Sequence, residues 1–113
     1  MGALAIRFQA EPVRTLDAGS VAVGYTGVGT AVDHPIRQFL IQNLTDQLLM
    51  FSFDGVNDHF PIPAGGFFLD DISSNRSQSV QGWYLAHGTR LYVKEIGTPT
   101  MGSVYFSVFY GAE

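Results

Sequence analysis

The stretch SVYFSVFY, residues 103–110, decides the fold class of this 113-residue chain. Large apolar side chains recur there at every second position, so Val104, Phe106, Val108 and Tyr110 share one face of an extended strand. A period of two in β-branched and aromatic residues is typical of a β-strand with one buried face. We find no segment longer than two turns that has helical spacing.

Similar short apolar runs, separated by turn residues, occur through the rest of the sequence. Leu4, Ile6 and Phe8 alternate in a first strand, which Pro12 ends because proline cannot donate to a β-ladder. Residues 36–43 and 49–54 look like the two strands of a hairpin. We expect further strands at 59–63, 67–72, 81–86 and 90–96. The strand at 59–63 can only be an edge strand, because Pro61 and Pro63 cannot donate to a β-ladder. This pattern predicts an all-β fold, a β-sandwich or jelly roll of about eight short antiparallel strands.

A stretch rich in glycine and other small residues, Ala18 to Val32, interrupts the pattern. Such segments bury few large side chains and specify strand register weakly. We therefore expect an extended N-terminal arm over residues 1–33 and a β-sandwich domain over residues 34–113. The chain length fits one hydrophobic core.

The composition points to a covered surface. Charged residues make up 14% of the chain, whereas about 25% is typical of a soluble domain. Aromatic residues reach 13%, and interface cores are depleted in charge and enriched in aromatics. These values predict a protein that binds other protein surfaces. The alternative is a sandwich whose surface is rich in Ser, Thr, Gln and Gly.

The same composition argues against several other classes of partner. The net charge is −4 and the six basic residues are scattered, so we expect no nucleic-acid binding. The uncharged stretch 18–32 is too short and too rich in Gly and Thr to span a membrane. The N-terminus lacks the features of a signal peptide, which predicts synthesis in the cytoplasm.

No motif indicates an enzyme or a cofactor. His34, His59 and His87 stand in separate turns without the spacing of a metal site, and Ser52 lacks a nucleophile elbow. We therefore expect no catalytic residue, metal or cofactor. The Asp54-Gly55-Val56-Asn57-Asp58 turn does not fit an EF-hand loop, and whether it binds an ion stays open.

Two parts of the sequence resemble small structural proteins encoded with the head genes of tailed bacteriophages. They are the stretch Ile41-Gln42-Asn43-Leu44-Thr45-Asp46 with Met50-Phe51-Ser52-Phe53-Asp54-Gly55, and the segment from Tyr92-Val93-Lys94 to Val104-Tyr105. Over about the last two-thirds of the chain, they are similar in particular to jelly-roll decoration (cement) proteins of capsids.

This resemblance implies a non-enzymatic virion structural protein on the capsid surface. Its partner would be the major capsid protein, and the chain would also self-associate as a dimer or trimer, without a cofactor. A phage neck or tail structural protein and a carbohydrate- or ligand-binding β-sandwich module are the alternatives.

On this hypothesis the arm would lie extended on a neighbouring subunit, and apolar or aromatic side chains would carry most of the binding energy. The candidate interface residues are Leu4, Ile6, Phe8, Val21, Val23, Tyr25, Phe60, Phe67, Trp83 and Tyr105.

Overall fold

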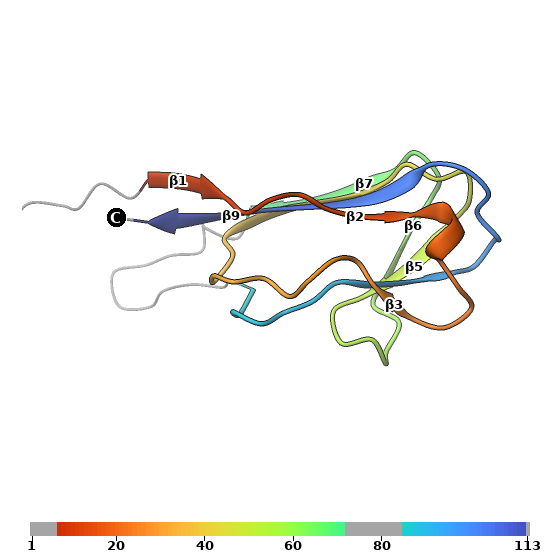
Figure 1. Cartoon of the computed structure of the whole chain (residues 1–113), viewed down its shortest axis with the longest axis horizontal. Helices are drawn as coiled ribbons and strands as arrows, with labels where there is room; N and C mark the ends of the chain where they lie inside the picture. The colour runs from red at the N-terminus through yellow and green to blue at the C-terminus, as the bar shows by residue number, and fades with distance from the viewer. Residues whose placement is uncertain (1–6, 72–84, 113) are drawn as a thin grey trace, which may run out of the picture.

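The computed structural model describes residues 7–71 and 85–112, which form two layered antiparallel β-sheets (Figure 1). The larger sheet contains β1 (Arg7–Ala10), β2 (Arg14–Asp17), β4 (Gln38–Asn43), β7 (Phe67–Asp71) and β9 (Ser103–Ala112). The smaller sheet contains β3 (Thr26–Gly27), β5 (Leu49–Ser52), β6 (Phe60–Ile62) and β8 (Tyr92–Glu95). Between β2 and β3 the chain forms a short 3-10 turn, η1 (Ala18–Ser20). No helix in the described ranges is long and apolar enough to cross a membrane.

The order of the strands confirms the predicted sandwich and gives it a jelly-roll connectivity. The larger sheet runs β1-β9-β4-β7, with β2 also paired to β9, and the smaller sheet runs β3-β8-β5-β6. β1 and β2 pair with successive halves of β9 and so act as one edge strand. From β2 onward, every connection except β5 to β6 passes from one sheet to the other. This wrapping of one chain around two sheets is that of a jelly roll.

β9, the strand with the clearest sequence pattern, lies in the middle of the larger sheet. β1 and β2 pair with one of its edges and β4 with the other. Its inward side chains Val104, Phe106 and Val108 are fully buried. They belong to one core cluster with Phe51 of β5 and Val93 of β8 in the opposite sheet.

The hairpin predicted over residues 36–54 does not form. β4 pairs with β7 and β9 in the larger sheet, whereas β5 pairs with β6 and β8 in the smaller one. Residues 44–48 therefore cross between the sheets. The alternation of apolar residues shows that each strand buries one face, but it does not show which strands pair. In the structure the buried faces of β4 and β5 oppose each other across the core.

Residues 7–33, predicted as an extended arm, are part of the sandwich. β1, β2 and β3 pair within the two sheets, and Val21, Val28 and Val32 are buried in the core. The small residues let this segment pass close to its neighbours: a Cβ on Gly29, which has a φ of +68°, would lie 2.8 Å from Arg14 side-chain atoms. Positions 1–6 of the predicted arm and most of the strand predicted at 81–86 lie outside the described residues.

Candidate functional site

The larger sheet gathers large apolar side chains on the face that points away from the core. Residues directly opposite each other in an antiparallel pair lie on the same face of the sheet. The register therefore defines a set that we call the outer face: Phe8, Leu40, Phe67, Leu69, Tyr105 and Phe109.

β4 and β7 supply one half of the outer face. Leu69 of β7 lies opposite Leu40 of β4, and Phe67 lies on the same face two residues earlier in β7. Burial along β4 alternates, with Phe39 and Ile41 buried and Leu40 half-buried, so Leu40 points away from the core. These three side chains thus form an apolar strip along the edge of the larger sheet.

β9 and β1 supply the other half. Tyr105 and Phe109 lie opposite Gln42 and Gln38 of β4. The rings of Phe8 and Phe109 stack with their centroids 5.1 Å apart and their planes 20° from parallel. Apolar side chains therefore stand on both halves of the outer face, and uncharged polar residues of β4 and β9 lie between them in the register.

The outer face is both exposed and poor in charge. Phe8 is 68% exposed, Phe67 66% and Leu69 62%. The residues of β4 and β9 that lie between them on this face are uncharged, and the charged positions in the same rows are Asp17, which ends β2, and Asp71, which ends β7. Uncharged surfaces with exposed aromatic and aliphatic side chains are typical of the centre of a protein–protein interface.

The ten candidate interface residues fall in different environments. Phe8, Phe67 and Tyr105 lie on the outer face. Val23 is exposed in a loop, whereas Val21 is a core residue. Phe60 and Tyr25 are half-buried, and Phe60 stacks on Phe51 with ring centroids 5.8 Å apart. Leu4, Ile6 and Trp83 lie outside the described residues.

Sequence patterns did not single out Leu40, Leu69 and Phe109. A signal was present, because both SVYFSVFY and FFLDD carry large apolar residues on both faces of the strand. In a two-layered sandwich one of those faces points to solvent, so a strand that is apolar on both faces indicates a covered surface.

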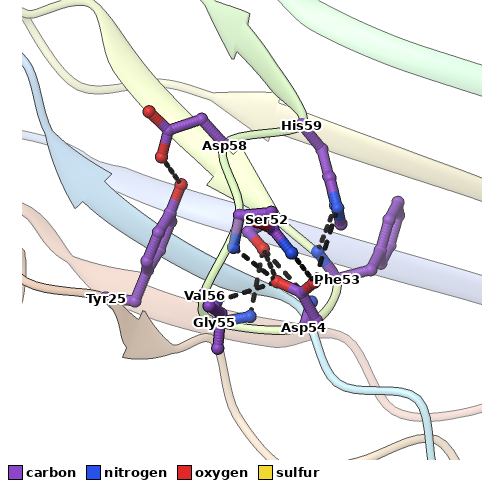
Figure 2. A network of polar contacts seen from close by, with 9 residues as sticks. Tyr25, Ser52, Phe53, Asp54, Gly55, Val56, Asp58 and His59 are labelled. Atoms are coloured by element: carbon purple, nitrogen blue, oxygen red, sulfur yellow. Dashed lines mark hydrogen bonds and ion pairs between the residues drawn. The ribbon is translucent and has the colours of Figure 1, made fainter.

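The loop between β5 and β6 is a second cluster of polar groups, and Asp54 closes it (Figure 2). Its Oδ1 accepts hydrogen bonds from Ser52 Oγ and from the N–H groups of Val56 and Asn57, each at 2.8 Å. Its Oδ2 accepts one from Asn57 Nδ2 at 2.9 Å. The N–H groups of Asn57 and Val56 are the main reason that the pKa of Asp54 lies well below its usual range.

These contacts bear on the possible ion site in this turn. Both oxygens of Asp54 accept hydrogen bonds from its own loop, so this carboxylate already holds the turn together. Within the described ranges, no group of three or more His, Asp or Glu residues could hold a metal ion. The cluster therefore acts as a turn that fixes its own loop.

We expect Asp54→Ala to lower the melting temperature clearly and Asp54→Asn to lower it less, because asparagine keeps an acceptor at Oδ1 for the loop N–H groups. Val56→Ala, a change at an exposed side chain in the same loop, serves as the control. Thermal unfolding followed by circular dichroism measures all three. Equal melting temperatures for Asp54→Ala and the control would contradict a structural role for this carboxylate.

The same loop holds a serine, an aspartate and a histidine, but their contacts differ from those of a nucleophile and its base. Ser52 is buried, and its Oγ donates to Asp54 and accepts from the N–H groups of Asp54 and Gly55. His59 Nδ1 accepts from the N–H of Phe53 at 3.0 Å. The proton of the neutral imidazole therefore lies on Nε2, which is 3.7 Å from Asp54 Oδ2. Ser52 is thus bonded to a carboxylate and two amides rather than to an imidazole.

Asp58 joins this loop to two other segments. Its Oδ1 accepts a 2.5 Å hydrogen bond from Tyr25 Oη and lies 2.8 Å from Lys94 Nζ. Lys94 Nζ also lies 4.9 Å from the centre of the Tyr25 ring. The bonds from Lys94 and Tyr25 lower the pKa of Asp58, while burial and the Asp58 carboxylate raise the pKa of Tyr25. Tyr25, a predicted interface residue, thus already has partners within the chain.

Comparisons of the chain with protein-family models, with curated proteins and with solved structures found no match. The outer face is therefore characterised by its own residues, and the polar loop is a structural element of the smaller sheet.

Proposed function

We propose that this chain is a non-enzymatic structural protein that binds a neighbouring protein subunit through the outer face of its larger sheet. One observation carries the proposal: Phe8, Phe67 and Leu69 are largely exposed on a face whose central residues are uncharged. Large apolar side chains that are exposed together on one uncharged face are typical of a protein–protein interaction site.

The energetics favour a partner that is apolar in the same region. Covering apolar surface contributes about 25 cal/mol per Å², less the cost of immobilising the two partners. Aromatic side chains such as Phe8 and Phe67 bury large areas and lose few rotamers, which makes them effective anchors. A charged partner surface would lose its hydration on this face without gaining an opposite charge.

The setting that we propose is the capsid surface of a tailed bacteriophage, with the major capsid protein as the partner. Support comes from the resemblance of residues 41–55 and of the segment 92–105 to decoration proteins. The jelly roll is also a frequent fold of viral capsid and lectin domains, although a fold alone does not define a function. A place in the neck or tail of the virion is the second setting that this resemblance supports.

The test is binding to capsid shells of the encoding phage that were produced without this protein. We expect the purified chain to cosediment with the shells, and Phe67→Lys and Phe8→Lys each to weaken binding about tenfold or more. The reason is that each variant places a charge in an apolar interface, and tenfold corresponds to about 1.4 kcal/mol.

The matched control is Val23→Lys, because Val23 is 80% exposed but lies in a loop away from the outer face. Circular dichroism shows whether each variant is folded. Equal binding of all three lysine variants would contradict the role of the outer face. Failure of the wild-type chain to bind shells, together with binding to isolated necks or tails, would move the proposed setting within the virion.

A further inference from the structure

β7 lies at the edge of the larger sheet and has apolar residues along most of its length. It is the last strand in the order β1-β9-β4-β7 and pairs with β4. Its sequence, FFLDD, contains neither proline nor glycine. Within the described residues, no backbone hydrogen bond joins β7 to a strand other than β4. Such an edge offers unpaired N–H and C=O groups to another strand.

The hydrogen bonds at the start of β7 show which of its backbone groups point outward. The N–H of Asn43 donates to Gly66 O, and the N–H of Gly65 donates to Asn43 O, so Asn43 faces β7. Backbone groups alternate along an antiparallel pair, so Ile41, which lies opposite Phe68, also faces β7. Phe68 and Asp70 therefore point their N–H and C=O groups toward β4, whereas Phe67, Leu69 and Asp71 point theirs away from it.

We propose that β7 pairs antiparallel with β7 of a second copy of this chain, about a two-fold axis at Leu69. In this arrangement the N–H and C=O of Leu69 bond to those of Leu69 in the second copy, and Phe67 pairs with Asp71 in the same way. The two larger sheets become one continuous sheet, and the two outer faces meet side by side through their Leu69 side chains.

The chemistry of the edge favours a second copy as the occupant. A strand paired antiparallel with itself is self-complementary, which is the condition for a closed two-fold dimer. Asp70 and Asp71 occupy the C-terminal end of β7, so antiparallel pairing places the two acidic pairs on opposite sides of the axis. Parallel pairing would align them instead. Because some repulsion between these carboxylates remains, dimerisation strengthens as added salt screens it.

This inference goes beyond the proposed function, because it uses the backbone edge of β7 and leaves the outer face open to a partner. A dimer would present two outer faces at once, so binding to a repeating shell would gain from avidity.

The sharpest test is a disulfide at the two-fold axis. Residues that exchange both backbone hydrogen bonds have Cα atoms about 5.5 Å apart, within the range that a disulfide spans. The natural chain contains no cysteine, so Leu69→Cys supplies the single thiol. We expect this variant to form a covalent dimer under mild oxidation much faster than Val56→Cys, whose side chain is 78% exposed in a distant loop. Equal rates for the two variants would overturn the pairing.

A second variant separates the backbone from the side chain. Leu69→Pro removes an N–H that points away from β4, so the fold tolerates it while the bond between copies is lost. We expect sedimentation to show a dimer for the wild type and for Leu69→Ala, and a dimer dissociation constant about tenfold or more higher for Leu69→Pro. A wild-type monomer that still binds shells would overturn the pairing and leave the proposed function intact. A dimer that binds no shells would contradict the proposed function and leave the pairing of β7 intact.

Discussion

Replacing Glu11 with alanine is expected to lower the free energy of unfolding by about 3–5 kcal/mol, because it leaves the buried Arg14 guanidinium without its counter-charge. The Glu11 side chain is 3% exposed, and its Oε1 lies 2.6 Å from Arg14 Nη2. Its Oε2 accepts a bond from the N–H of Asp33 at 3.0 Å and lies 2.7 Å from His34 Nδ1. Urea unfolding with an unchanged m-value would measure the loss.

The effect is large because this cluster fastens residues 30–34 to the turn between β1 and β2. Arg14 also donates from Nε to Thr30 O at 2.7 Å and from Nη2 to Ala31 O at 3.0 Å. The ring of His34 stacks on Tyr110 of β9 with its centroid 3.6 Å away. Without Glu11, the buried Arg14 guanidinium loses its counter-charge, and residues 30–34 lose a contact that holds them to the turn between β1 and β2.

A double-mutant cycle with Arg14→Met provides the control. Glu11→Leu and Arg14→Met each break the pair alone, whereas together they remove both charges, so we expect the double variant to cost clearly less than the sum of the two. Additive costs would show that the two side chains do not stabilise each other.

The same carboxylate gives the stability a defined dependence on pH. Burial raises the pKa of Glu11, but the bonds from His34, Arg14 and the N–H of Asp33 outweigh it, and the pKa falls below the ordinary 4.5. A lowered folded-state pKa contributes stability above the unfolded-state value that is lost as pH falls through the folded value. The stability difference between wild type and Glu11→Gln should therefore be largest near neutral pH and shrink below about pH 4.5.

Sequence patterns predicted where the strands of this fold lie better than they predicted which strands pair with each other. The alternation in residues 103–110 is local, and β9 has the inward face that it predicted. Pro61 and Pro63 indicated an edge strand over residues 59–63, and β6 is at an edge. The supposed hairpin of residues 36–54 depended on which strands pair, and that is set by contacts distant in sequence.

The segment 7–33 and the outer face were missed for related reasons. Val21, Val28 and Val32 are small, and a sequence does not show that a short side chain fills a gap in a distant core. The partners of Glu11 lie 3 to 23 positions away, so a buried carboxylate looks like an ordinary surface residue. The outer face appears only when the register places Leu40 beside Leu69 and Phe8 beside Phe109.

Replacing Asn43 with alanine is expected to lower the free energy of unfolding by about 2–4 kcal/mol, because several buried polar groups lose their partner at once. Asn43 is fully buried at the end of β4. Its Nδ2 donates to Gln47 O at 2.9 Å and to Ile62 O at 2.8 Å, and its Oδ1 accepts from Thr45 N–H and Oγ1. The amide thus joins β4 in one sheet to β6 in the other across the 44–48 connection.

Two variants make this prediction specific. Leu44→Ala, at an exposed neighbouring side chain, is expected to change stability by less than about 0.5 kcal/mol. Asn43→Asp keeps the acceptor for Thr45 but places an oxygen against two carbonyls, so its cost should exceed that of alanine and grow as pH rises. If Asn43→Ala were as mild as Leu44→Ala, another contact would have to hold the crossing. A large loss would mean that the Asn43 amide holds the 44–48 connection in place, where the chain leaves β4 of the larger sheet for β5 of the smaller one.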